Sequence, residues 1–175
     1  MEIIKPPIEG LLVIKPKIFE DDRGHFFESW SKGAFSKIGL DLDFIQDNQS
    51  LSKKGVLRGL HIQTKKSQAK IITVVDGKIL DVVVDLRKKS KTYGKHFAIE
   101  ISKNSDFSLF IPENFAHGFL CLSKTCTVYY KCTNYRNEKT ETTIKWNDRD
   151  LKIKWPVKKP ILSSKDNAGI AFSEY

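Results

Sequence analysis

The stretch KIITVVDGKILDVVVDL, residues 70–86, limits the kind of fold that this chain can adopt. It contains two mostly β-branched runs, typical of strands, on either side of Asp76 and Gly77, two residue types that tolerate the positive φ angles of a type I′ turn. The sequence therefore predicts a β-hairpin, and strand alternation puts Lys70 and Asp81 on one face of it. Both faces are largely apolar, which indicates a strand pair buried on two sides, as in a small barrel with Lys70 inside.

The rest of the chain indicates a mainly β protein. Residues 114–122 and 125–132 alternate in the manner of strands, while short helices are expected only at 31–39 and 163–167. No internal repeat or linker divides the chain, and 175 residues that are 40% hydrophobic suffice for one core. We expect a single domain over 1–175 with short peripheral helices.

The formal net charge of +9 raises the question of a nucleic-acid partner. Only five of the 30 basic residues are arginine, and the lysines are scattered without a basic helix or an aromatic stripe, so a solvated surface is the simpler interpretation. No apolar run approaches the roughly 18 residues of a membrane span. Cys121, Cys126 and Cys132 lack the spacing of a disulfide framework or zinc ribbon and are interpreted as reduced. We expect a cytoplasmic protein with no nucleic-acid or membrane partner.

Polar residues interrupt the apolar stretch VLRGLHIQ, residues 56–63. Burying an unpaired charge is costly, so Arg58 and His61 need partners or an occupant of the space that they face. His61 and Gln63 have the same parity along a strand, whereas Arg58 has the opposite one. A β-bulge at Gly59 would turn Arg58 to the same side, and we predict one there.

Five polar residues from separate predicted strands are candidates for a shared interior: Arg58, His61, Lys70, His117 and Tyr130. Taken singly, a histidine on an apolar face is more often a hydrogen-bonded core residue, and a strand tyrosine usually packs. A cation, a base and a phenol that converge in one barrel are costly to bury for stability alone. Together they favour a binding or catalytic site.

A metal centre is the first kind of site to test against these residues. His61 is followed by Ile62 and Gln63, which gives no H-x-H pair, and no Glu follows four or five positions later. The segment PENFAH, 112–117, resembles the second motif of the cupin barrels, with Asn114 at the glycine position, where asparagine tolerates a left-handed φ. The sequence therefore predicts a cupin-like barrel that has lost its metal ligands.

Nine segments, in order over nearly the whole chain, resemble the dTDP-4-dehydrorhamnose 3,5-epimerase family: DDRGHFFESW (21–30), FIQDNQSLS (44–52), VLRGLHIQ, QAK (68–70), DVVVDLR (81–87), NFAHGF (114–119), YYK (129–131), IKWNDRDLKIKWP (144–156) and SSKD (163–166). The resemblance implies a jelly-roll, cupin-like double-stranded β-barrel that acts as a homodimer. It also implies an isomerase, without metal or organic cofactor, that inverts C3 and C5 of a nucleotide-linked 4-keto-6-deoxy sugar. The implied reaction converts dTDP-4-keto-6-deoxyglucose to dTDP-4-keto-rhamnose for polysaccharide synthesis.

The resemblance also implies the catalytic roles. A C–H bond beside a ketone is acidic only if the enolate is stabilised, so the site needs a base, an oxyanion donor and an acid on the opposite face. By similarity, His61 is the base and Asp166 its carboxylate partner. Lys70 meets the C4 oxygen, with Asp81 helping it to remain charged, and Tyr130 returns the proton.

The substrate-binding residues implied by the resemblance fall into four groups. The diphosphate is assigned to Arg23 and Arg58, polar contacts to Glu28, Gln46 and Asn48, stacking to Phe26 and Tyr135, and orientation of the substrate or support of the His–Asp pair to His117. In the family some of these residues cross from the neighbouring subunit. The simpler alternatives are an ion pair of Arg23 with a neighbouring aspartate and a core position for Phe26.

The residues alone leave alternative functions open. An enzyme of the same fold that inverts only C3 or only C5 uses the same base, lysine and tyrosine, and a non-catalytic sugar-nucleotide binder shares the barrel. The segments 65–67 and 160–162 depart from the family pattern, so the sequence leaves their loop shapes open.

Overall fold

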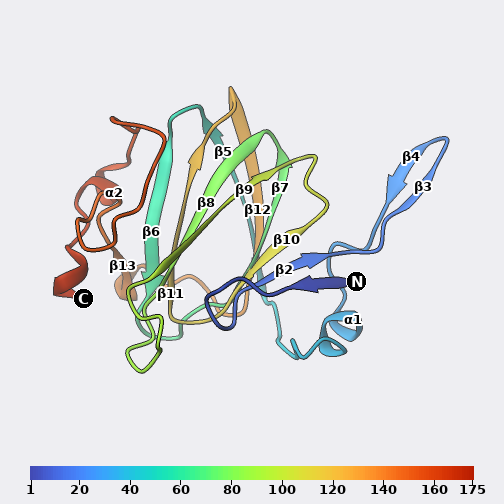
Figure 1. Ribbon diagram of the computed structural model, residues 1–175, viewed down its shortest axis with the longest axis horizontal. Helices are drawn as coiled ribbons and strands as arrows, with labels where there is room; N and C mark the ends of the chain where they lie inside the picture. Colours follow the sequence, from blue (N-terminus) through green and yellow to red (C-terminus); the bar gives the residue numbers. More distant parts are fainter.

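Two β-sheets face each other across a shared interior in the computed structural model, which describes all of residues 1–175 (Figure 1). The strands are β1 (Glu2–Ile4), β2 (Leu12–Lys15), β3 (Phe19–Asp21), β4 (Gly24–Phe26), β5 (Gln46–Lys53), β6 (Leu57–Gln63), β7 (Lys70–Asp76), β8 (Lys78–Asp85), β9 (His96–Ser102), β10 (Ser108–Ile111), β11 (Phe115–Cys121), β12 (Thr125–Cys132) and β13 (Glu141–Thr143). The helical segments are α1 (Lys32–Ser36), α2 (Ser164–Asn167) and the 3₁₀ turns η1 (Glu138–Thr140) and η2 (Phe172–Glu174). Both short helices lie within the ranges predicted for them.

The two sheets form a jelly-roll, cupin-like barrel, as the sequence predicted. One sheet has the order β1-β2-β10-β7-β12-β5 and the other β13-β6-β11-β8-β9, with antiparallel pairing throughout. Alternate residues of both sheets point inward and form the main core, which includes Ile72, Val74, Ile79, Val83 and Val128. The inward positions closer to β13 and α2 carry polar residues instead.

The predicted hairpin of 70–86 is wrong in its pairing. β7 lies between β10 and β12 in the first sheet, whereas β8 lies between β11 and β9 in the second, so the chain crosses from one sheet to the other at Gly77. Of the two turn residues only Gly77 has a positive φ (76°), which does not fit a type I′ turn. The prediction of which residues share a face is nevertheless correct. The residues predicted to lie on one face of the hairpin are the alternate residues of β7 and β8 that point into the space between the two sheets.

The predicted bulge at Gly59 is confirmed. β6 pairs with β11 in a register that shifts between His117 and Phe119, so that two residues of β6 stand opposite Gly118 alone. A Cβ atom at Gly59 would lie 2.6 Å from the His117 carbonyl oxygen, and its φ is +105°. Glycine is therefore required where the bulge brings Arg58 and His61 to the same cavity. Asn114 also has the left-handed φ expected of it, at 64°.

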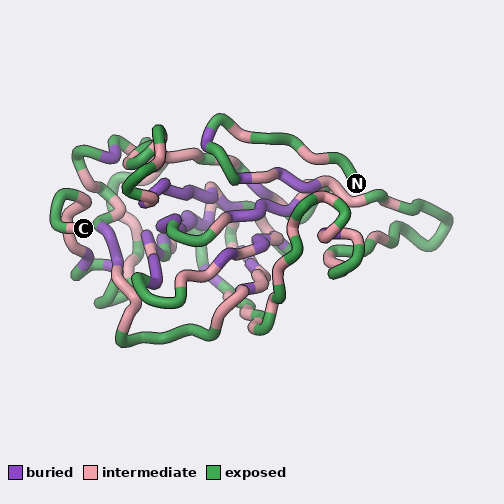
Figure 2. The backbone as a smooth tube through the Cα atoms, turned by 90° about the horizontal axis from the view of Figure 1, so that it is seen from below, coloured by how far each residue is buried: buried purple, intermediate pink, exposed green.

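The chain covers the outer faces of its own sheets. Residues of the C-terminal segment, among them Leu151 and Trp155, pack on the outer side of β6, β8 and β11. Phe35 of α1 and Phe44 pack on the outer side of β7 and β10. The buried residues follow the two sheets in Figure 2, whereas the β3–β4 hairpin extends beyond the body of the molecule and is exposed.

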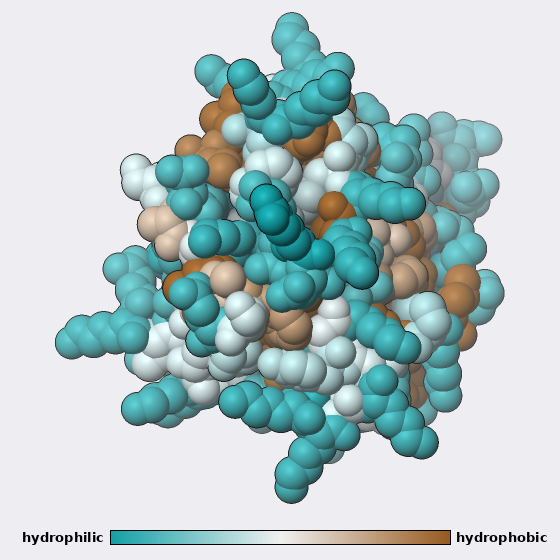
Figure 3. All heavy atoms as spheres, turned by 60° about the vertical axis from the view of Figure 1, so that its left-hand side comes forward, coloured by the Kyte–Doolittle hydropathy of each residue, from teal (hydrophilic) through white to brown (hydrophobic).

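The surface is mainly hydrophilic on the face drawn in Figure 3, where hydrophobic residues form only small separate groups. No helix of the protein is both long enough and apolar enough to cross a membrane. Cys121, Cys126 and Cys132 are buried free thiols.

Candidate active site

A cavity of about 570 Å³ opens between the two sheets and is lined by the predicted catalytic residues. Its lining comes from β5, β6, β7, β11, β12, β13, α2 and the loop between β12 and η1. It includes Asn48, Arg58, His61, Lys70, His117, Tyr130, Arg136, Glu141, Lys165 and Asp166. A smaller hollow of about 60 Å³ beside it shares six of these residues and adds Gln46, Gln63 and Gln68. All four residues predicted to be catalytic lie around one space.

His61 and Asp166 form a close pair. The Nε2 atom of His61 lies 2.5 Å from Oδ1 of Asp166, although the two residues are 105 positions apart in the chain. The N-cap of α2 fixes the carboxylate, since Ser163 donates to Oδ2 (2.7 Å) and the Gly59 amide donates to Oδ1 (3.2 Å). Burial by itself would raise the pKa of Asp166, but the hydrogen bonds from His61 and Ser163 outweigh it and lower the pKa. Asp166 is therefore an ionised acceptor, and His61 donates to it through Nε2.

Lys70 lies in the cavity at the first position of β7. Burial lowers the pKa of its amine, and the negative charges of Glu141 and Asp81 act against that effect. The expected contribution of Asp81 is thus present, but burial is the larger influence. An amine held in a protein-enclosed cavity is suited to stabilise a nearby oxyanion, because its charge is poorly screened there.

Tyr130 faces the same cavity from β12, the strand adjacent to β7. Burial raises the pKa of its phenol, while the charges of Arg58 and Arg136 act in the opposite direction. The phenol is consequently protonated at neutral pH and available as a proton donor.

A second histidine–carboxylate pair lies next to the first. His117 stands directly opposite His61 in the β6–β11 ladder, and its Nε2 lies 2.8 Å from Oδ2 of Asp81, which is completely buried. The other oxygen of Asp81 has no hydrogen-bond partner. Asp81 therefore orients His117, a contact that the sequence analysis did not predict.

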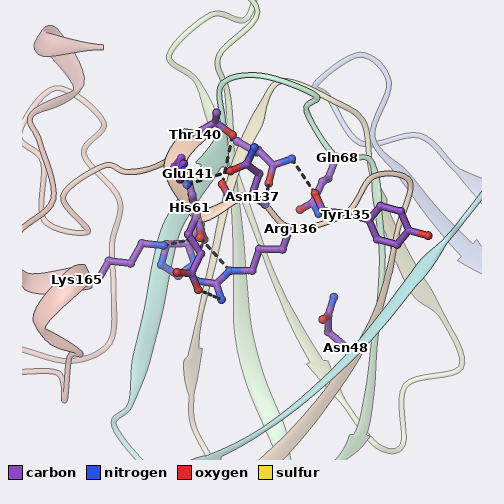
Figure 4. A network of polar contacts seen from close by, with 12 residues as sticks. Asn48, His61, Gln68, Tyr135, Arg136, Asn137, Thr140, Glu141 and Lys165 are labelled. Atoms are coloured by element: carbon purple, nitrogen blue, oxygen red, sulfur yellow. Dashed lines mark hydrogen bonds and ion pairs between the residues drawn. The ribbon is translucent and has the colours of Figure 1, made fainter.

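Four of the eight predicted substrate-binding residues lie at the cavity or its adjoining hollow: His117, Arg58, Gln46 and Asn48. Arg58 is held by Ser52 Oγ (3.0 Å) and the Leu51 carbonyl (3.1 Å). Gln46 donates to Asn48 Oδ1 (2.9 Å) on β5. Tyr135, by contrast, is 69% exposed, and its ring points away from His61 in Figure 4.

The remaining three predicted binding residues are not brought to the cavity of their own chain. Arg23, Phe26 and Glu28 lie on or just after the projecting β3–β4 hairpin. Arg23 pairs with Asp21 and its side chain is 90% exposed, while Phe26 is 67% exposed. The ion-pair alternative for Arg23 is thus present, and a core position for Phe26 is excluded.

The sequence analysis missed three charged residues that meet beside His61 (Figure 4). Glu141 of β13 accepts from Arg136 Nε (3.0 Å) and from Lys165 Nζ (2.7 Å), both at its Oε2 atom. Its Oε1 atom lies 3.9 Å from Nδ1 of His61. The only sequence signal was the position of Lys165 next to Asp166, because charged residues in polar segments otherwise look like solvated surface.

Two loops next to the cavity are tied together by side chains. Gln63, which is buried, donates to the carbonyls of Lys66 (2.6 Å) and Tyr135 (3.2 Å) and accepts from the Asn137 amide (2.8 Å). Gln68 donates to the Asn134 carbonyl (2.6 Å). These contacts fix both the loop that carries Arg136 and the loop 65–67 whose shape the sequence left open, and they give Gln63 its partners.

Polar groups around one cavity in a jelly-roll barrel suit acid–base chemistry on a small polar substrate. Sugar-nucleotide epimerases are a class of enzymes with this fold and this kind of site. The chain belongs to the dTDP-4-dehydrorhamnose 3,5-epimerase family, whose model matches residues 5–174.

Individual relatives show the same similarity. The chain is 45% identical, over 93% of its length and 90% of the relative's, to a dTDP-4-dehydrorhamnose 3,5-epimerase of Methanothermobacter thermautotrophicus. A crystal structure of the epimerase from Elizabethkingia anophelis is 42% identical with a TM-score of 0.95, covering 99% of this chain and 97% of that one. A Legionella pneumophila 3,5-epimerase, solved in complex with dTDP-4-keto-L-rhamnose, is 40% identical with a TM-score of 0.92, covering 96% and 90%.

Proposed function

We propose that this protein inverts C3 and C5 of a dTDP-linked 4-keto-6-deoxy sugar, converting dTDP-4-keto-6-deoxyglucose to dTDP-4-keto-rhamnose. The unprotonated Nδ1 atom of His61 removes the proton from the carbon beside the ketone. The electron pair of that C–H bond moves to the C4 oxygen, and the Lys70 amine stabilises the resulting enolate. Tyr130 then returns a proton to the carbon from the other side, which inverts the configuration.

The observation that carries this proposal is the placement of base and acid on opposite walls. His61 belongs to β6 of one sheet, while Tyr130 and Lys70 belong to neighbouring strands of the facing sheet, and all three line the same cavity. Inversion requires that the proton leaves one face of the planar enolate and arrives at the other. Two proton-transfer groups on facing sheets meet that requirement.

Deuterium incorporation tests the reaction directly. Incubation of the protein with dTDP-4-keto-6-deoxyglucose in D₂O is expected to introduce deuterium at both C3 and C5, because the proton returned at each inversion comes from the Tyr130 hydroxyl, which exchanges with solvent. Proton NMR of the sugar measures the loss of each C–H signal. Deuterium at one carbon alone would reduce the function to a single-site epimerase, and none at either carbon would leave only a sugar-nucleotide binder.

The active form is proposed to be a homodimer in which each subunit completes the other's site. Arg23, Phe26 and Glu28 lie on or just after an exposed hairpin that extends away from the cavity of its own chain. An arginine and an aromatic ring suit a nucleoside diphosphate, so these residues would act in the cavity of a second copy.

The reaction would take place in the cytoplasm, in keeping with three free thiols.

Subunit mixing tests the shared site. Arg23→Gln impairs only the donated hairpin and His61→Ala only the cavity, so each homodimer is expected to be nearly inactive. A mixed dimer contains one native site, and an equimolar mixture should recover about a quarter of wild-type activity. Exchange is verified by co-purification of differently tagged subunits. Exchanged subunits without recovered activity would contradict the donation.

A further inference from the structure

The imidazole of His61 lies between two carboxylates. Asp166 occupies Nε2 at 2.5 Å, so Nδ1 is the nitrogen with the free lone pair. The carboxylate nearest to Nδ1 is that of Glu141, at 3.9 Å. This separation is longer than a hydrogen bond but short enough for strong attraction between a carboxylate and an imidazolium.

Two cations hold Glu141 by its other oxygen. Arg136 and Lys165 both contact Oε2, at 3.0 and 2.7 Å, and the Glu141 side chain is only 12% exposed. Burial would raise the pKa of Glu141, but Lys165, His61 and Arg136 together lower it, so Glu141 is a carboxylate. A largely buried carboxylate without these cations would favour a proton on Nδ1, and a protonated His61 cannot act as a base.

Arg136 is itself held in place. Its amide donates to Gln46 Oε1 (2.9 Å), and its Nη1 pairs with Glu138 (2.8 Å). Its loop is tied down on both sides by the contacts of Gln63 with the Tyr135 carbonyl and the Asn137 amide. The position of the guanidinium is therefore built into the fold.

We propose that Arg136 is a positioning residue for the base: together with Lys165 it holds Glu141 through Oε2 and so keeps Nδ1 of His61 unprotonated and free to reach the substrate. The inference rests on the proposed function, in which His61 removes the proton. Arg136 acts on the reaction through Glu141.

The other groups around His61 remain in place when Arg136 is changed. They are Asp166 and Lys165 of α2, His117 of β11, Lys70 of β7, Tyr130 of β12 and Arg58 of β6. The Arg136 charge also acts on the Tyr130 phenol, which affects the alkaline side of the profile, so a change on the acidic side reports the loss of the guanidinium next to Glu141.

Arg136→Gln is expected to move the acidic limb of the pH profile of kcat/KM to higher pH. Glu141, then compensated by Lys165 alone, stabilises protonated His61 more strongly, so activity requires a more alkaline solution. On the acidic side kcat/KM is expected to fall severalfold, and it approaches the wild-type value as pH rises. Initial rates of dTDP-4-keto-6-deoxyglucose turnover across pH 5 to 9 give the profile.

Companion variants separate this role from a structural one. Arg136→Lys keeps the positive charge and should leave the acidic limb of the pH profile near its wild-type position. The double variant Arg136→Gln/Glu141→Gln should return the limb to that position, because the carboxylate that needed compensation is gone. Arg149→Gln, a change at an exposed arginine outside the cavity, is the matched control. An unmoved limb in Arg136→Gln, or a shift that persists in the double variant, would overturn the inference. A wild-type protein without deuterium exchange would instead overturn the proposed function.

Discussion

His61→Ala is expected to reduce turnover by about a hundred- to ten-thousand-fold while the affinity for dTDP changes by no more than a few-fold. The imidazole is the only group next to Asp166 that can accept the substrate proton, whereas the proposed nucleotide contacts are made by other side chains, such as Arg58. Initial rates at saturating substrate give the loss in kcat, and calorimetric titration with dTDP gives the affinity. The expected signature is a large fall in kcat with little change in binding.

His96→Ala is the matched control for this experiment. His96 lies on β9, paired with Val84 and outside the cavity, so its loss should leave both kcat and affinity close to the wild type. Unchanged turnover in His61→Ala would remove the base from the mechanism. A loss of dTDP affinity as large as the loss of turnover would instead point to a role in binding.

Lys70→Met is expected to have opposite effects on activity and on stability. Loss of the amine removes the donor to the enolate oxygen and should lower kcat by about a hundred- to a thousand-fold. The pKa of Lys70 is lower in the folded protein than in the unfolded chain, so at neutral pH its positive charge opposes folding. A methionine of similar length should therefore raise the free energy of unfolding by about 1 kcal/mol.

Thermal denaturation and initial rates measure the two effects on the same samples. Lys124→Met, at an exposed lysine in the turn between β11 and β12, should change neither quantity substantially. If Lys70→Met kept wild-type turnover, the amine would have no part in stabilising the enolate. A lower unfolding temperature would show that the charge is compensated in the folded state.

Strand positions and inward faces could be predicted from the sequence because both depend on local patterns. The alternation in 70–86 correctly placed Lys70 and Asp81 on the inner side. The partner of a strand depends on distant parts of the chain, and an Asp-Gly pair occurs both in hairpins and in turns that lead into another sheet. The predicted pairing of β7 with β8 failed for that reason.

The candidate site could be predicted only in part. Resemblance to the family supplied His61 and Asp166, which the structure brings into contact, whereas spacing alone could not connect positions so far apart. Arg136 and Glu141 were missed because their importance depends on burial and on each other. Such a network has no periodicity, so only the folded arrangement identifies it.

The passage of the chain from one sheet to the other after β7 also affects how the protein becomes active. Strands that are adjacent in the sequence pair with strands far along the chain, as β5 does with β12 and β6 with β13. The native contacts are therefore largely long-range. Topologies of this kind fold slowly, on a scale of milliseconds to seconds. The carboxylate partner of His61 is contributed by residue 166, 105 positions further along the chain, so the site forms only when α2 has packed beside β6. Recovery of catalysis after dilution from denaturant therefore reports the packing of α2 beside β6.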